Sequence, residues 1–472
     1  MTPDSSRFPV PPEVLALGQA IQKAGGVPVL VGGWVRDCLL GAPQQNGFDL
    51  EVFRLGPDPL RSVLARFGPV HAVGRHFGVL KLMSRGLEFD VSVPRRESKT
   101  GKGHKGFMVE PDPSMTFEEA AARRDFTINS MGYEFLERRF LNPFGGLEHL
   151  RARLLRHVGP AFSEDPLRVL RAMQFAGRFQ FSIAEETLAL CRAQDLTELP
   201  RERVWEEIKK LMLRSARPSL GWRYAEALGV LRILPELAEL KHIEDQAAPG
   251  RGEEPGQGAW SRALAAVDAM AAQAEGDVPS RLHLSLALLC HELGRTAPGL
   301  ASAPYGQAVA RAASAPTATF LGRLTNEQEV ASAVLPLIEE LPVVAELRAK
   351  SGQSGVDPDI RRLALRAPLS SLARCSAARD QALPPGAQSK DPPDAVWLRE
   401  QAIRLGVWQA PPEPLLKGRH LVERGYARGP AMGELLRRAF ERQLDGEFDT
   451  LDAALVWLGR QQPDGALGKE HS

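Results

Sequence analysis

Residues 28–53, PVLVGGWVRDCLLGAPQQNGFDLEVF, decide the fold class of the N-terminal part of this chain. The apolar run before the Gly-Gly pair predicts a strand that ends in a tight turn, and WVRDCLLG predicts a helix that ends at Gly41. FDLEVF has the composition of a further strand, as do VLKLM (79–83) and LEFDVSV (87–93). Strands that alternate with helices in this way predict an α/β domain.

The remainder of the chain is expected to be helical. From about Ser163 the strand signals fade, and segments such as 165–179 and 203–213 carry apolar residues at helical spacing. Residues 244–258 and 380–394 are rich in Pro, Gly and charge, which is typical of solvated linkers. These boundaries predict a head (1–160), a helical neck (161–243), a middle helical domain (259–378) and a helical C-terminal tail (395–472).

The composition indicates where in the cell the protein acts, but it does not indicate what the protein binds. The chain has 472 residues, and 59 Lys and Arg residues nearly balance 58 Asp and Glu residues, so any basic surface must be local. Its four cysteines are far apart without CxxC spacing, which argues against a disulfide framework and a zinc site. The first residues, MTPDSSRFPVPPE, lack the features of a signal peptide, and apolar runs such as 286–290 are too short to span a bilayer. We therefore expect a soluble, cytoplasmic protein.

The Gly-Gly turn is a candidate phosphate site. Gly32 and Gly33 allow close approach of a phosphate to the backbone, and the following helix offers free N–H groups. Arg36, one turn into that helix, can donate two hydrogen bonds to phosphate oxygens. An ordinary strand-to-helix turn is the alternative interpretation.

Two carboxylates follow on one predicted strand. Asp49 and Glu51 lie at i and i+2, so they point to the same face and can share a cation. Carboxylates of this kind hold Mg²⁺ in enzymes that act on phosphates, and Asp90 in LEFDVSV is a candidate third ligand. Acidic residues that merely mark the solvent face of a strand are the alternative.

Several motifs together resemble one family. In chain order, GGWVRDCLLG, FDLEVF, PRRESKTGKGHKGF, RRDFTINSM, NPFGGLEHL and FSEDPLRVLRAMQFAGRF are similar to the head and neck of bacterial CCA-adding enzymes and their poly(A) polymerase relatives. The resemblance implies a polymerase-beta-like α/β nucleotidyltransferase head with a mixed sheet, followed by an elongated all-α body. It also implies template-independent addition of CCA, from CTP and ATP, to the 3′ end of tRNA, with Asp49, Glu51 and Asp90 holding Mg²⁺. An A-only or poly(A)-adding enzyme and a catalytically degenerate RNA-binding protein remain alternatives.

The resemblance assigns further residues to a nucleotide site. It places Arg124, Asp125 and Asn129 of RRDFTINSM, together with Gly32, Gly33, Arg36 and Asp37, around the sugar and triphosphate. Asp165 and Arg168 of EDPLR share a helix face, and the family uses this pair to recognise the base of CTP or ATP. Arg171, one turn further, is expected to reach the triphosphate, and Gln174 stands where the family has another arginine. A surface ion pair is the plainer interpretation of Asp165 and Arg168.

Two flanking segments also resemble the family. The basic loop SKTGKGHKGF (98–107) lies where a family loop helps the switch from C to A addition, which argues against an enzyme that adds only C. In RERVWEE, Arg203 and Glu206 are expected to support the base-recognition helix.

The chain departs from the family pattern at two places. The family has Asp-x-Asp, and alignment on FDLEVF puts Gly47 at the first position. Either Asp49 and Glu51 become the metal pair after a two-residue shift, or Asp49 keeps its usual role and the site binds metal poorly. LCHELGR (289–295) resembles an HD phosphohydrolase motif, but Glu292 replaces its Asp and Arg262 stands at its first histidine. We therefore expect His291 to be a helix residue, not a ligand, and we expect no phosphohydrolase activity.

Overall fold

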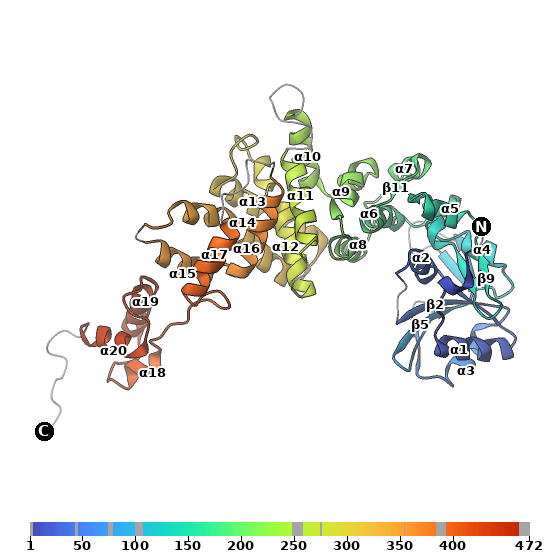
Figure 1. Cartoon of the computed structure of the whole chain (residues 1–472), viewed down its shortest axis with the longest axis horizontal. Coiled ribbons are helices and arrows are strands. Elements are labelled where there is room, and N and C mark those ends of the chain that lie inside the picture. The colour runs from blue at the N-terminus through green and yellow to red at the C-terminus, as the bar shows by residue number, and fades with distance from the viewer. Residues whose placement is uncertain are drawn as a thin grey trace. The chain divides into compact units, whose positions relative to one another are not determined.

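The computed structural model describes residues 3–42, 46–73, 79–99, 107–247, 258–273, 276–353, 355–383 and 393–461. The chain forms two compact units, residues 1–233 and residues 234–472. The first unit contains the β-sheet, and the second is helical (Figure 1). No helix in the described ranges combines the length and the hydropathy needed to cross a membrane.

The first unit is built on a seven-stranded mixed sheet. Its strand order is β3-β4-β5-β2-β1-β8-β9, in which β2 and β5 are parallel and the other neighbours are antiparallel. The strands are β1 (Val27–Val31), β2 (Gly47–Phe53), β3 (Val70–Val73), β4 (Val79–Ser84), β5 (Leu87–Ser92), β8 (Gly132–Glu134) and β9 (Arg139–Leu141). The predicted mixed α/β head is therefore confirmed, with β1, β2, β4 and β5 at the predicted stretches.

Alternation along β2 positions the candidate carboxylates. Phe48, Leu50 and Val52 are buried in the head, because successive side chains of a strand point to opposite faces. Asp49 and Glu51 consequently lie on the other face. The helices of the head are α1 (Pro12–Lys23), α2 (Gly33–Leu39), α3 (Pro57–Leu64), α4 (Phe117–Ala121) and α5 (Gly146–Arg151).

The basic loop predicted at 98–107 lies mostly outside the described residues. The backbone on either side of it forms a two-stranded antiparallel sheet of β6 (Arg95–Lys99) and β7 (Phe107–Pro111). Residues 100–106 are not described.

The neck completes the first unit. It contains α6 (Leu167–Phe179), α7 (Glu185–Arg192), α8 (Arg201–Arg214) and α9 (Pro218–Ala227), and α6 packs against both α8 and α9. Gly177 of α6 permits this packing, because a Cβ atom there would lie 2.5 Å from Leu211 Cδ1. Val169, Leu170 and Met173 are buried in the neck, which leaves the arginines of α6 on its other face.

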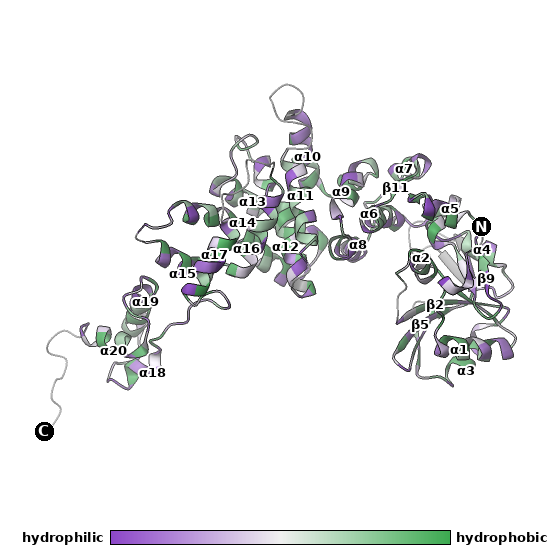
Figure 2. Ribbon diagram, viewed as in Figure 1, coloured by the Kyte–Doolittle hydropathy of each residue, from purple (hydrophilic) through white to green (hydrophobic). Residues whose placement is uncertain are grey.

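The second unit is formed by helices. They are α10 (Pro235–Ala247), α11 (Ala259–Ala271), α12 (Val278–Cys290), α13 (Gln307–Leu324), α14 (Gln328–Ala349), α15 (Val356–Arg366), α16 (Leu369–Gln381), α17 (Asp394–Arg404), α18 (Gly418–Val422), α19 (Pro430–Leu444) and α20 (Leu451–Gly459). Hydrophobic and hydrophilic residues occur together along these helices, as in amphipathic helices (Figure 2). Residues 415–458 have a core of their own around Leu421, Phe448 and Leu458. Of the two predicted linkers, residues 244–247 continue α10, and 248–257 and 384–392 are not described.

The HD-like segment of the second unit contains an ion-pair network. His291 is buried, with its Nδ1 atom 2.7 Å from the carbonyl oxygen of Leu288, and burial lowers the pKa of its imidazole to about 4. The buried Glu292 carboxylate accepts from Arg262 at 3.2 Å and also pairs with Arg295. The guanidinium groups of Arg262 and Arg295 thus contact the Glu292 carboxylate, which stands where the HD phosphohydrolase motif has an aspartate.

Candidate active site

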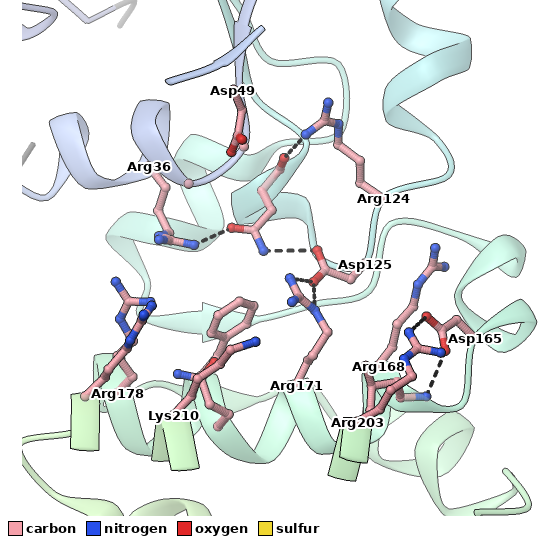
Figure 3. A pocket seen from close by; sticks show the side chains of 17 residues that line it. Arg36, Asp49, Arg124, Asp125, Asp165, Arg168, Arg171, Arg178, Arg203 and Lys210 are labelled. Atoms are coloured by element: carbon pink, nitrogen blue, oxygen red, sulfur yellow. Dashed lines mark hydrogen bonds and ion pairs between the residues drawn. The ribbon is translucent and has the colours of Figure 1, made fainter. Parts of the chain in front are cut away.

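The residues predicted to bind nucleotide surround one pocket of the first unit. The pocket has a volume of about 500 Å³ and lies between the GG turn, the start of the RRD segment and helices α6 and α8 (Figure 3). Eight cationic and three carboxylate side chains line it, so it favours an anionic ligand. The lining contains ten of the predicted residues: Gly32, Gly33, Arg36, Asp49, Arg124, Asp125, Asn129, Asp165, Arg168 and Arg171. Asp37, Glu51 and Asp90 are not among the lining residues.

The backbone of Gly32 brings the turn close to a carboxylate and a guanidinium. Gly32 has φ 68° and ψ −127°, a conformation that side chains disfavour, and it precedes α2 directly. A Cβ atom at this position would lie 3.2 Å from Arg124 Nη1 and 3.7 Å from Asp49 Oδ2. Glycine therefore keeps the turn within reach of both groups.

A buried polar network joins α2 to α6. Arg36 donates to Asn129 Oδ1 at 2.6 Å and pairs with Asp37 at 2.7 Å. Asn129 donates to Asp125, which also accepts from Arg171 Nε at 2.7 Å. Burial alone would raise the pKa of Asp125, but Arg171 and the hydrogen bond from Asn129 outweigh it and lower the pKa below its usual value. The network fixes α2 of the head against α6, and Asp37 is a buried member of it that orients Arg36.

The predicted carboxylates differ in their surroundings. Asp49 faces the pocket, and its pKa is raised by desolvation and then by the nearby Asp90. The two residues are direct neighbours on the parallel strands β2 and β5. Glu51 instead accepts from Arg124 Nη2 at 3.0 Å, and Asp90 pairs with Lys81 Nζ at 3.1 Å.

This geometry bears on the two alternatives for the metal site. Gly47 begins β2 beside Glu88, so this strand offers no carboxylate at the first position of the family pattern. Glu51 is bound by the Arg124 guanidinium and Asp90 by the Lys81 ammonium group, while burial and then the neighbouring Asp90 carboxylate raise the pKa of Asp49. Among the described residues, no group of three or more His, Cys, Asp or Glu side chains is placed to hold a metal. Asp49 and Asp90 are the two candidate carboxylates that the pairing of β2 with β5 places side by side.

The predicted base-recognition pair lies at one end of the pocket. Asp165 Oδ1 accepts from the backbone N–H of Leu167, and its Oδ2 accepts from Arg203 at 3.0 Å. Arg168 donates to the carbonyl oxygens of Arg123 and Ala161, both at 2.6 Å. Arg203 thus lines the pocket itself, in addition to the supporting role expected for it.

Sequence reasoning missed three cations of the pocket, Arg178, Lys210 and Arg214. Arg178 follows Arg171 by seven residues on α6, and Lys210 and Arg214 follow Arg203 by seven and eleven residues on α8. Residues at these spacings lie on one face of a helix. The helical periodicity that continues from Arg171 and from Arg203 was therefore the signal in the sequence that could have found these three cations.

Two family models match the first half of the chain. Residues 29–156 match the poly A polymerase head domain, and residues 180–241 match the probable RNA and SrmB-binding site of polymerase A. The first match includes the GG turn, Asp49 and the RRD segment.

Several proteins resemble this chain in sequence or in structure. It is 42% identical over 226 residues to the multifunctional CCA protein of Xanthomonas campestris, with 46% of this chain and 53% of that protein aligned. It is 36% identical over 313 residues to the multifunctional CCA protein of Xylella fastidiosa strain M23, with 64% and 71% aligned. The chain therefore spans only about half of the Xanthomonas relative. The fold is similar to a CCA-adding enzyme of Bacillus stearothermophilus solved with CTP (TM-score 0.64, 23% identity, 96% and 98% of the chains covered).

Proposed function

Because the chain belongs to the family of the multifunctional CCA proteins, we propose that it is a template-independent nucleotidyltransferase that adds CCA to the 3′ end of tRNA. Its substrates would be CTP, ATP and a tRNA that lacks part or all of its CCA end. All four cysteines are free and buried, which suits the cytoplasm as the proposed place of the reaction.

One observation carries the proposal. A single cationic pocket brings together the GG turn, the Asp49 carboxylate and the Asp165 and Arg168 pair. A nucleoside triphosphate has the matching parts, because its phosphates suit the turn and its base suits the polar pair. A protein that only bound RNA would not need a carboxylate beside a phosphate turn.

In the proposed reaction, an oxygen of the RNA 3′-hydroxyl attacks the α-phosphorus of CTP or ATP. A new P–O bond forms there, and the bond from the α-phosphorus to the oxygen that bridges it to the β-phosphate breaks. Pyrophosphate leaves with the electron pair, and the hydroxyl proton passes to solvent. Arg124, which lies 3.2 Å from the Cβ position of Gly32, is placed to stabilise negative charge beside the turn. The Arg36 to Arg171 network holds these groups in place without further rearrangement.

Nucleotidyltransferases of this family generally use divalent metal ions. We propose Mg²⁺ for this chain, held by Asp49 and Asp90, because hard cations take carboxylate oxygens and these two carboxylates are neighbours on β2 and β5. The ion would offset charge on the phosphates and on the attacking oxygen.

The proposal is tested with tRNA transcripts that end before CCA, after C or after CC, in the presence of Mg²⁺ and labelled CTP or ATP. We expect extension of at least one transcript, and CCA addition requires C incorporation before A. Incorporation of A alone, or of many A residues, would indicate the A-only or poly(A)-adding relative. Binding of tRNA with no extension of any transcript would indicate a degenerate RNA-binding protein, the outcome that Gly47 favours.

A further inference from the structure

The segment that carries Arg124 and Asp125 is held by contacts that lie outside the pocket. Its next residues form a short, buried 3₁₀ helix, Thr127–Asn129. Arg124, Asp125 and Asn129 all line the pocket. The backbone of this segment therefore decides where three pocket groups lie.

The segment pairs with the backbone of residues 156–158. The N–H of Thr127 donates to the carbonyl oxygen of Arg156 at 2.9 Å, and the N–H of Val158 donates to the carbonyl oxygen of Asp125 at 3.2 Å. Phe126 and His157 form an antiparallel bridge between these two bonds. These contacts fix the direction of the backbone just before the 3₁₀ helix.

Helix α5 of the head holds the same segment at Thr127. Gly146, at the start of α5, lies against the carbonyl oxygen of Thr127, which a Cβ atom at Gly146 would overlap. About one turn along α5, His149 Nδ1 and Thr127 Oγ1 form a hydrogen bond of 2.9 Å. Thr127 thus meets α5 through both its backbone and its side chain.

The His149 ring contributes a hydrogen bond to this contact, not a charge. Burial lowers the pKa of its imidazole, and the nearby Arg156 lowers it further. The ring is therefore neutral at neutral pH, with one nitrogen as a donor and the other as an acceptor. His149 is not among the residues that line the pocket, so any effect on nucleotide transfer would be indirect.

We propose that His149 is a positioning residue of the nucleotidyl transfer, which holds Thr127 so that Arg124 and Asp125 keep their places in the pocket. This inference rests on the proposed function and deepens it. Thr127 lies two residues after Asp125, which accepts from Arg171 at 2.7 Å, so a displacement of Thr127 would disturb this contact. A shift of about 1 Å in a group that orients a substrate can slow a reaction by about a hundredfold.

A second pair of the same kind provides a matched control. His157 Nδ1 and Thr187 Oγ1 form a hydrogen bond of 2.8 Å, and Thr187, like Thr127, is buried. Thr187 lies on α7 and does not line the pocket. Thr127→Val and Thr187→Val therefore remove the same kind of bond, but only Thr127→Val removes it from the segment that carries pocket residues.

The test compares these two variants with His149→Leu and His149→Asn in the tRNA extension assay, at a temperature where circular dichroism shows every variant folded. Leucine and asparagine are similar in size, but only asparagine keeps a polar atom near the position of Nδ1. We expect kcat for CTP incorporation to fall about tenfold in Thr127→Val and His149→Leu, with little change in KM for the tRNA. His149→Asn should recover most of the wild-type kcat, and Thr187→Val should keep it.

A role in stability alone would give a different pattern. Thr127→Val and Thr187→Val should lower the urea midpoint by similar amounts, because each leaves a histidine nitrogen without its partner. The double variant of His149→Leu and Thr127→Val should be no slower than either single variant, since all three lack the same bond. Equal kcat values for the two threonine variants, or no recovery in His149→Asn relative to His149→Leu, would overturn the proposal.

Hydrogen exchange tests the positioning without tRNA or nucleotide. The N–H of Thr127, which donates to Arg156, should exchange faster in His149→Leu than in the wild type, and at about the wild-type rate in His149→Asn. A wild type that extends no transcript would refute the proposed function alone. An unchanged exchange rate of the Thr127 N–H in His149→Leu would instead refute the positioning role, whatever the result of the extension assay.

Discussion

Replacement of Gly32 by alanine tests whether the GG turn is a substrate site or only a connection. Gly32 has φ 68° and ψ −127°, and a residue with a side chain in such a region costs about 1–3 kcal/mol of folding free energy. The added methyl group would also lie 3.2 Å from Arg124 Nη1, tighter than ordinary contact, so Arg124 would have to move. That movement would disturb its 3.0 Å bond to Glu51 and occupy space next to Asp49.

Gly41→Ala provides the matched control at the other end of α2. Gly41 also has a positive φ, 79°, but a Cβ atom there would meet no described atom within 4 Å. Both variants should therefore lose about 1 kcal/mol or more of stability in denaturant unfolding. Only Gly32→Ala should also lose activity.

We expect kcat/KM for CTP incorporation to fall at least tenfold in Gly32→Ala, which corresponds to about 1.4 kcal/mol of lost transition-state stabilisation. The assay is extension of a tRNA that lacks CCA, at a temperature where both variants are fully folded by circular dichroism. Equal kcat/KM values for Gly32→Ala and Gly41→Ala would refute the assignment of the turn to the substrate site.

Further predictions concern the carboxylates, the base site and the second unit. Asp49→Asn should abolish nucleotide incorporation in the extension assay. Glu51→Gln should retain measurable activity, because Glu51 is bound to Arg124 at 3.0 Å. An equal loss of activity in the two variants would indicate that Glu51 is a metal ligand. Asp165→Ala should relax rejection of UTP relative to CTP about tenfold in competition assays. Arg203→Ala, which removes a pocket cation but keeps the Asp165 carboxylate, should relax it less. His291 has its pKa lowered to about 4, so its contribution to stability is present above about pH 6.5 and is lost as the pH falls toward 4. In His291→Gln, the free energy of unfolding measured with urea should fall less steeply between about pH 6.5 and 4 than in the wild type. An unchanged pH dependence would show that the buried His291 imidazole is not the cause of the loss of stability in acid.

The sequence predicted the elements that carry local signals. The apolar run before Gly32 and the alternation of FDLEVF gave β1 and β2 directly, and helical spacing gave α6. Strands β8 and β9 have three residues each and were not predicted, because so short a stretch contains too little periodicity. β8 joins the sheet through pairing with β1, a contact between residues about one hundred positions apart, and β9 pairs with β8.

Most residues of the site can be predicted from the sequence, because they lie in compact motifs. The sequence does not show which of these side chains contact one another. Asp49 and Glu51 share a strand face, which made them the natural metal pair in the sequence. The parallel pairing of β2 and β5 instead puts Asp90 beside Asp49, and the RRD segment brings Arg124 to Glu51. Strand register depends on long-range packing, so local spacing could not distinguish between the two acidic partners of Asp49.

The two departures from the family pattern affect different steps of the proposed reaction. In the proposed reaction, Gly47 leaves one carboxylate fewer for the ion, and Gln174, which stands where the family has an arginine, leaves one positive charge fewer in the pocket. The pocket nevertheless keeps eight cations against three carboxylates, and Arg214 is one of them. An excess of protein cations binds polyphosphate without requiring an ion, while the transfer step depends on the metal. Nucleotide affinity in EDTA should therefore stay measurable even where incorporation is slow, so affinity and rate must be measured separately in this protein.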